Sequence, residues 1–121
     1  MNTIRLYGIR NCDTVQRARQ WLTAHAATYE FHDLAKAGVP VDRLQGWVQA
    51  LGWQAVLNRK GSTWRKLDET TRADVVDAVT SVAVLRLNPS LIKRPVVEWL
   101  DGRCSLGFDA DDWLNRIAIE T

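Results

Sequence analysis

Cys12 is the residue of this chain with the clearest capacity for chemistry, because it follows a predicted strand and precedes a predicted helix. Residues 3–7 alternate apolar and polar side chains, which predicts a half-buried strand. Gly8 then permits a bend, and Asp13 or Thr14 is expected to cap the helix that follows. In that helix Val15, Ala18 and Leu22 share one face. Cys12 therefore lies where unpaired backbone N–H groups and the positive end of a helix dipole favour a thiolate.

A helix terminus alone does not activate such a thiol. An unperturbed cysteine has a pKa near ~8.5, and a thiolate that predominates at neutral pH needs roughly 2 kcal/mol of additional stabilisation. A helix terminus supplies only ~0.3–1 kcal/mol. We therefore expect a cationic side chain close to Cys12. The alternative is that Cys12 is a small buried residue without reactivity, but its place before a capped helix favours a nucleophile.

Composition indicates one globular domain, 1–121, of ordinary type, since 46% of its residues are hydrophobic and 25% are charged. The formal charge of +2 is too small to indicate direct nucleic-acid binding. Neither a membrane span nor a signal peptide is expected, so the predicted location is the cytoplasm. Both cysteines are expected to be reduced, and the chain is expected to be a monomer.

The order of expected elements predicts an α/β protein. Residues 28–33 form a second strand that is parallel to the first, and a helical insertion follows at about 38–90. Residues 96–100 and 103–108 then form a hairpin, and a last helix closes the chain. This β-α-β, helical insertion, β-β-α order gives a mixed four-stranded sheet of the thioredoxin-like fold.

Within the insertion, a helix is expected at 41–51, with Leu44, Trp47, Val48 and Leu51 on one face and Asp42 as its cap. A second helix is expected at 53–57 and a turn at 61–63. A longer helix is expected from 70 to 87. Its expected apolar face consists of Val75, Val76, Val79, Val82 and Ala83. The last helix of the chain is expected to begin at Asp109 or Asp111, with an apolar face of Trp113, Leu114 and Ile117.

Arg94 is the strongest candidate for the cation near Cys12. A guanidinium presents a forked set of donors to a thiolate or an oxyanion, and Arg94 comes just before the third strand. In a thioredoxin-like fold that position lies beside the cysteine loop, although a lone arginine there is more often a surface charge. Cys104, on the hairpin, is expected to be structural. The two histidines have no metal-ligand spacing, so no metal site is expected.

The chain resembles the arsenate reductase and Spx-like family of the thioredoxin fold, and within it the YffB-like branch. The likeness covers essentially the whole chain and rests on four segments: 7–14, 57–67, 91–95 and 106–108. It implies that Cys12 is the nucleophile, that Arg94 lies near it and that the bond before Pro95 is cis.

Two features distinguish the branches of this family. The late arginine that arsenate reductases use to bind the oxyanion falls on Gly107, and Arg59 stands one residue out of register for the early one. Spx regulators often carry a Cys-x-x-Cys redox switch, whereas here Val15 occupies the position of the second cysteine. The sequence thus has no local dithiol.

The leading hypothesis is a glutathione-dependent thiol reductase that holds no bound cofactor and uses glutathione as co-substrate with a disulfide or an oxyanion. Cys12 and Arg94 are its catalytic residues. The residues expected to bind substrate or glutathione are Asn11, Asp13, Thr14, Arg59, Arg65, Lys93 and Pro95. One alternative is a glutathione-coupled arsenate reductase. The other is a non-enzymatic Spx-like regulator that binds RNA polymerase.

Overall fold

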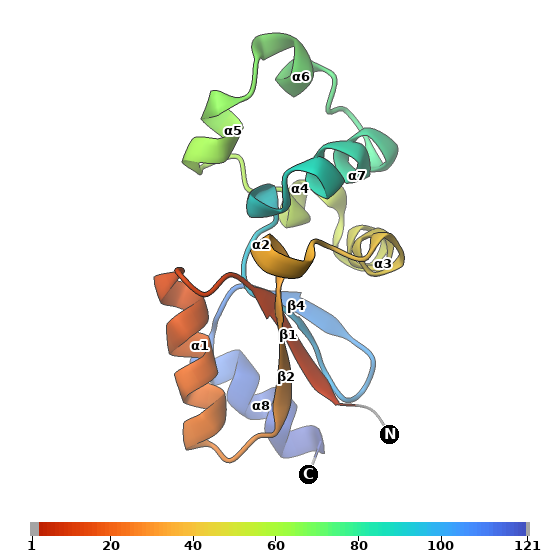
Figure 1. Ribbon diagram of the computed structural model, residues 1–121. Coiled ribbons are helices and arrows are strands. Elements are labelled where there is room, and N and C mark those ends of the chain that lie inside the picture. Colours follow the sequence, from red (N-terminus) through yellow and green to blue (C-terminus); the bar gives the residue numbers. More distant parts are fainter. Residues whose placement is uncertain (1–2, 121) are drawn as a thin grey trace. The chain divides into compact units, whose positions relative to one another are not determined.

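The chain forms two compact units, and the second interrupts the first in the sequence. The computed structural model (Figure 1) describes the backbone of residues 3–120 and the side chains of residues 3–118. The first unit contains the chain up to Asp33 and the chain from Arg94 onward, and the second is Leu34–Lys93.

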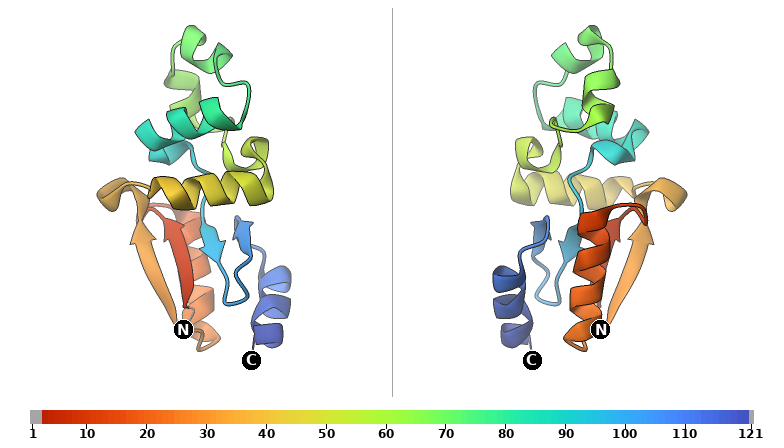
Figure 2. Two further views of the ribbon diagram at one scale, coloured as in Figure 1. Left: turned by 90° about the vertical axis from the view of Figure 1, so that its right-hand side faces the viewer. Right: turned by 90° about the vertical axis from the view of Figure 1, so that its left-hand side faces the viewer.

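The first unit is a sheet with helices, drawn in red and orange for its first part and in blue for its second (Figure 2). Its elements are β1 (Ile4–Gly8), α1 (Asp13–Ala24), β2 (Tyr29–Asp33), β3 (Val96–Glu98), β4 (Cys104–Leu106) and α8 (Ala110–Glu120). The strand order is β2-β1-β3-β4. The β1–β2 pair is parallel, whereas β1–β3 and β3–β4 are antiparallel. This is the predicted mixed four-stranded sheet.

The core of the first unit lies on one face of this sheet. Its buried side chains come from β1, from β3 and the residue after it, and from both helices: Ile4, Leu6, Val15, Ala18, Leu22, Val97, Trp99 and Trp113. Val15, Ala18 and Leu22 follow helical spacing, so α1 turns one apolar stripe to the sheet. Because α1 and α8 share this cluster, both helices cover the same face.

Trp113 is the centre of an aromatic group in this core. Its ring meets those of Trp99 and Phe108 edge-to-face, with centroids 5.1 and 4.8 Å apart. The indole N–H of Trp99 donates to the hydroxyl of Ser105 at 2.9 Å, which satisfies both groups where they are buried. Leu114, predicted on the apolar face of α8, is 50% exposed instead, because it lies one position, about 100°, around the helix from Trp113.

Gly8 is the last residue of β1. A Cβ at this position would lie 2.8 Å from Cγ2 of Val15, closer than carbon atoms approach without a shift. The absent side chain therefore allows the first turn of α1 to pack directly on the end of β1.

The second unit is helical. Its elements are α2 (Leu34–Ala37), α3 (Val41–Leu51), α4 (Trp53–Val56), α5 (Ser62–Lys66), α6 (Glu69–Ala73), α7 (Ala78–Leu87) and the 3₁₀ turn η1 (Pro89–Leu91). In α3, Leu44, Trp47 and Val48 are buried as predicted, but the N-cap is Pro40 rather than Asp42. Gly61 likewise serves as the N-cap of α5, so the turn predicted at 61–63 is wrong.

In residues 3–120, no helix combines the length and the apolar character that crossing a bilayer needs.

The single helix predicted over 70–87 is also wrong, because α6 and α7 are separate helices. Asp77 is the N-cap of α7: its carboxylate accepts from the backbone N–H of Thr80 at 2.8 Å, and the Thr80 hydroxyl accepts from the Asp77 N–H at 3.0 Å. This capping box starts a new helix within the predicted one. The buried face shifts as a result, and Val76 and Val79 are 64% and 79% exposed.

The capping box gives a prediction for the stability of the protein. The Thr80 backbone N–H, and next its hydroxyl, hold the pKa of Asp77 below its usual range. Ionised Asp77 therefore contributes stability at pH values above the usual aspartate range, and the contribution is lost as pH falls through its folded-state pKa. At pH 7, Asp77→Ala should lower the melting temperature by roughly 2–5 °C.

Asp77→Asn is the matched control, because asparagine caps helices about as well without a charge. Thermal unfolding of the three proteins is followed by circular dichroism between pH 2.5 and 7. The melting temperature of the Ala variant should approach that of the parent at low pH. A constant difference over that whole range would contradict the role of the ionised carboxylate.

Candidate active site

Cys12 is the N-cap of α1, with φ −125° and ψ 119°. The predicted caps, Asp13 and Thr14, are instead the first two residues of the helix, so they miss the N-cap by one and two positions. The Cys12 carbonyl accepts from the backbone N–H of Gln16 at 2.9 Å and so makes the first helical hydrogen bond. Its half-buried side chain packs against the core of the first unit. The thiol thus lies where the first N–H groups of a helix have no intrahelical partners.

Two contacts that sequence reasoning missed hold the cysteine loop. The guanidinium of Arg10 lies 3.5 Å from the carboxylate of Asp33 at the end of β2. The side-chain amide of Gln16 donates to the Arg10 carbonyl at 3.0 Å. The loop is therefore fastened both to the neighbouring strand and to the helix it starts. No local pattern signals the ion pair with Asp33, because β1–β2 pairing alone brings Asp33 beside Gly8.

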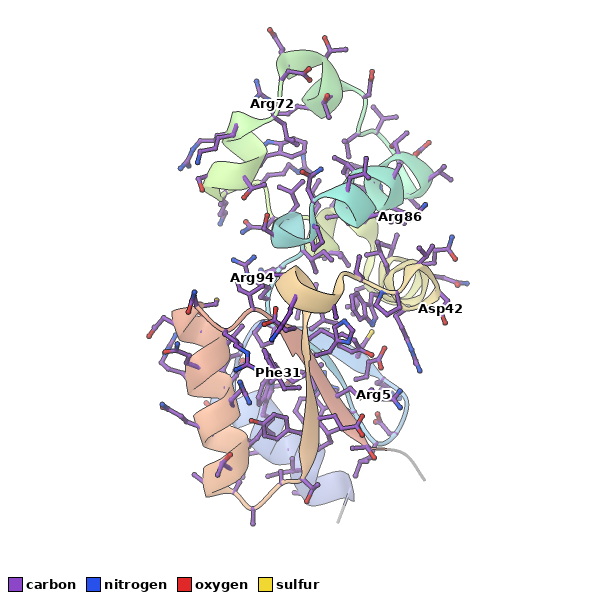
Figure 3. All side chains as sticks on the ribbon, in the orientation of Figure 1. Arg5, Phe31, Asp42, Arg72, Arg86 and Arg94 are labelled. Atoms are coloured by element: carbon purple, nitrogen blue, oxygen red, sulfur yellow. The ribbon has the colours of Figure 1, made fainter. Side chains whose placement is uncertain are left out.

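Sheet pairing brings Arg94 to the end of the sheet at which the cysteine loop begins. Tyr7 of β1 pairs with Val96 of β3, so the residues before Val96 lie beyond the same end of the sheet as those after Tyr7. Figure 3 labels Arg94 at this end, where α1 begins. Arg94 is half-buried and its Nε atom is fully buried. The Arg94–Pro95 peptide bond is cis, as the resemblance implied.

The other predicted site residues fall into two groups. Asn11, which is exposed, and Asp13 and Thr14 belong to the cysteine loop and the first turn of α1. The Asp13 carboxylate makes an ion pair of 3.3 Å with Arg17 on the next turn. The residues of the second group, Arg59, Arg65 and Lys93, are exposed and belong to the second unit.

Contacts within the second unit orient two of its basic residues. Arg59 stacks against Trp53, with its guanidinium carbon 5.4 Å from the ring centroid. Arg65 donates to the carbonyl of Lys60 at 3.2 Å.

Cys104 lies on the opposite face of the sheet from Cys12. Leu6, Val97 and Ser105 are successive partners across three strands, and the first two face the core against which Cys12 packs. Cys104 pairs with Glu98, one position along the strands, so its side chain is on the other face. Both cysteines are free thiols. Because the sheet separates the two side chains, Cys104 cannot reach Cys12 in the folded unit.

Within residues 3–118, the acids, histidines and cysteines form no cluster that could hold a metal ion. The site therefore consists of one thiol at a helix N-terminus and the Arg94–cis-Pro95 segment at the same sheet end. A four-stranded mixed sheet that carries such a thiol in its first strand-to-helix loop defines a thioredoxin-like fold protein.

The chain belongs to the ArsC family, whose model matches residues 7–116. The solved structure of the YffB protein is 45% identical, covers 94% of this chain and 98% of its own, and superposes with a TM-score of 0.89. An arsenate reductase (ArsC) related protein from Brucella melitensis is 38% identical, with 96% and 95% of the chains covered and a TM-score of 0.72.

Two further relatives are similar to this chain in sequence. An uncharacterized protein of Haemophilus influenzae is 37% identical over 110 residues, which are 91% of this chain and 95% of that protein. The global transcriptional regulator Spx of Streptococcus pyogenes is 24% identical over an alignment of 116 positions, which covers 90% of this chain and 81% of Spx.

The surroundings of Cys104 predict low reactivity for its thiol. Burial, and next the negative charge of Glu98, raises the pKa of Cys104, so little thiolate is present at neutral pH. Iodoacetamide at pH 7.5 should label Cys104 far more slowly in the folded protein than in urea. Glu98→Gln keeps an oxygen that accepts from Tyr7 and should speed the labelling roughly two- to fivefold, the effect of about 0.5–1 kcal/mol of charge repulsion.

Peptide mass spectrometry measures this labelling site by site. Glu30→Gln is the matched control, since Glu30 lies on the edge strand β2 and pairs with Arg5. Equal labelling of Cys104 in the parent, the Glu98 variant and the control would show that Glu98 has no such effect.

Proposed function

We propose that this protein is a glutathione-dependent thiol reductase with Cys12 as its single nucleophile. The observation that carries the proposal is the placement of the two cysteines: Cys12 caps α1 at the end of the sheet where Arg94 lies, while Cys104 is on the opposite face. A thiol without an internal partner must be regenerated by an external one, which is monothiol chemistry.

The reaction follows from this arrangement. The Cys12 thiolate attacks one sulfur of a disulfide substrate, the substrate S–S bond breaks, and the second half leaves as a thiolate that takes a proton from water. A glutathione thiolate then attacks the substrate's sulfur in the mixed disulfide with Cys12. Cys12 leaves as the thiolate, and the products are its free form and a glutathione disulfide.

Other residues have supporting roles in the proposal. The Arg94 cation stabilises the Cys12 thiolate as attacking and leaving group. Asn11 and the first N–H groups of α1, at Asp13 and Thr14, complete the site around the Cys12 thiolate. The segment at Pro95 lines the site. The protein acts as a monomer in the cytoplasm, where glutathione keeps thiols reduced.

Arsenate reduction is the runner-up, and Gly107 is the observation against it. Its φ of +75° is a conformation that glycine adopts readily and an arginine adopts only with strain. Its backbone N–H donates to the Pro95 carbonyl at 2.9 Å. This position next to the cis-proline therefore carries no guanidinium, which an oxyanion site would need there.

A regulatory role is the non-enzymatic alternative. The exposed Val76 and Val79 in the second unit, together with the likeness to Spx, are the observations in its favour. RNA polymerase retained by immobilised protein regardless of Cys12→Ser would support this alternative over the enzyme.

The central test uses two cysteine variants. Turnover of a glutathionylated peptide by reduced glutathione, coupled to glutathione reductase, should be abolished in Cys12→Ser. The matched variant Cys104→Ser should keep near-parental turnover, because that thiol faces away from the site. Equal turnover by the parent and Cys12→Ser would refute the proposal. Arsenate-dependent oxidation of glutathione in the same assay would favour the runner-up.

Arg94 gives a second test. A hydrogen bond to a charged group contributes about 1.5–3 kcal/mol, so Arg94→Ala should lower kcat/KM roughly 10- to 150-fold. Arg94→Lys keeps the charge but not the forked donors, so its kcat/KM should lie between those of the parent and Arg94→Ala. Arg103→Ala is the control, because that arginine is 83% exposed on the β3–β4 turn and pairs with Asp101. An Arg94→Ala enzyme as active as the control would remove Arg94 from the mechanism.

A further inference from the structure

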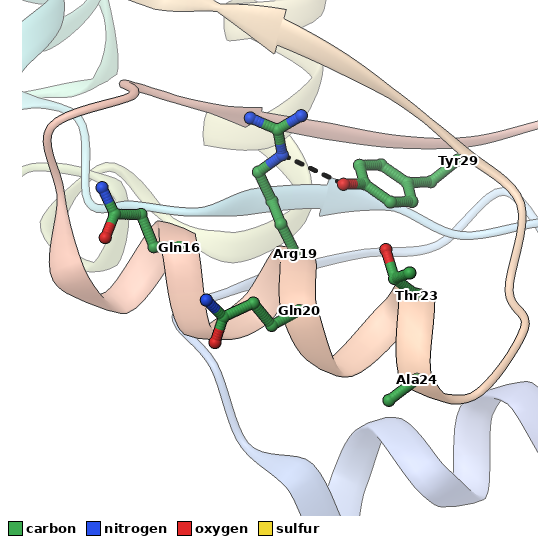
Figure 4. A pocket seen from close by; sticks show the side chains of 6 residues that line it. All are labelled: Gln16, Arg19, Gln20, Thr23, Ala24 and Tyr29. Atoms are coloured by element: carbon green, nitrogen blue, oxygen red, sulfur yellow. Dashed lines mark hydrogen bonds between the residues drawn. The ribbon is translucent and has the colours of Figure 1, made fainter.

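A groove in the first unit follows α1 on the side of the edge strand β2 (Figure 4). It is lined by Gln16, Arg19, Gln20, Thr23, Ala24 and Tyr29. Among these six residues Arg19 is the only charged one, and the two glutamines, Thr23 and Tyr29 add neutral hydrogen-bonding groups. We call it the α1–β2 groove. The proposed function assigns it no role.

Arg19 is held in a fixed orientation in this groove. Its Nε donates to the Tyr29 hydroxyl at 3.0 Å, and its guanidinium carbon lies 4.0 Å from the centroid of the Phe31 ring. Stacking on the ring fixes the guanidinium plane, and the bond to Tyr29 fixes its rotation. These contacts use Nε and one face of the group, so the two terminal Nη groups form a preorganised fork.

The α1–β2 groove continues the face of α1 on which Cys12 lies. Gln16, Arg19 and Thr23 come 4, 7 and 11 positions after Cys12, which places all four residues along one stripe of an α-helix. From Cys12 to Arg19 the helix rises about 10.5 Å, and long helical side chains lean back toward the N-terminus. The guanidinium is thus less than about three extended residues of a peptide from the thiol.

We propose that the α1–β2 groove binds a carboxylate of the thiol compound that forms the mixed disulfide with Cys12. The inference rests on the proposed function, whose nucleophile it shares, and it names the substrate class: a short thiol peptide with a carboxylate about two to three residues from its sulfur. A single planar guanidinium among neutral donors matches a monoanionic carboxylate, which it binds through two parallel hydrogen bonds. A phosphate dianion would call for more positive charge.

The groove acts on the step in which the Cys12 thiolate forms a bond to one sulfur of a disulfide. The half that stays on Cys12 carries the carboxylate to Arg19, and the other half leaves as a thiolate that is protonated by water. Binding of the carboxylate therefore favours acidic disulfides over neutral ones of similar reactivity.

The test is a ratio of rate constants. Adduct formation at Cys12 is followed by mass spectrometry with oxidised glutathione and with the neutral bis(2-hydroxyethyl) disulfide, and the ratio of the two rates is taken for each protein. The ratio cancels changes in thiolate concentration. In the parent it should exceed the ratio for free N-acetylcysteine amide, a thiol without a charge of its own, and Arg19→Gln should lower it about three- to tenfold.

Arg17→Gln is the matched control. It removes the same charge from the same helix, but Arg17 lies outside the groove, where it pairs with Asp13. Its ratio should stay near that of the parent. A parent ratio no higher than that of the free thiol would overturn the proposal. Equal ratios in the parent and Arg19→Gln, or an equal fall in both variants, would also overturn it.

These outcomes are separate from failure of the proposed function. Formation of the first adduct is measured without turnover, so a protein that is no reductase can still show the Arg19 preference. Conversely, if turnover depends on Cys12 but Arg19→Gln has the same ratio as the parent, the proposed function stands and the role of the α1–β2 groove is refuted.

Discussion

The antiparallel pairing of β1 with β3 is the constraint on which the first unit depends. It joins segments far apart in the sequence: the hydroxyl of Tyr7 donates to Glu98, 91 positions later, at 3.0 Å. Closing a loop of that size costs roughly 4 kcal/mol of chain entropy. Burial of Leu6 and Val97, partners in this pairing, offsets the cost, since each such side chain contributes about 1.5–3 kcal/mol. The same register brings the Arg94 segment to the end of the sheet where the cysteine loop begins.

The sheet also determines what kind of thiol chemistry is available. Side chains alternate between its faces, and this alternation puts Cys104 on the face opposite the core to which Cys12 belongs. In the proposed reaction, a Cys12 adduct is therefore resolved by an external thiol, and the residues around the sulfur must recognise that thiol. In our proposals Arg94 acts on the sulfur itself, whereas Arg19 acts on a distant carboxylate of the bound compound.

The sequence predicted the elements of the first unit better than those of the second. Alternating apolar residues located all four strands within a few positions, and the spacing of Val15, Ala18 and Leu22 gave the correct buried face of α1. In the second unit, short helices are separated by caps at Asp68 and Asp77. A run of apolar residues at helical spacing hides such caps, because a carboxylate that starts a helix looks like any exposed acid until its hydrogen bonds are seen.

The sequence by itself determined the order of strands and helices along the first unit, the place of Cys12 before a helix and the absence of a second cysteine nearby. These features are local, and local periodicity and spacing encode them. Only the tertiary structure decided that Asp33 fastens the cysteine loop, that Cys104 faces away, and that Tyr29 and Phe31 orient Arg19. Each of these depends on which residues of different strands lie side by side. The register that sets this comes from packing of the whole unit rather than from any short segment.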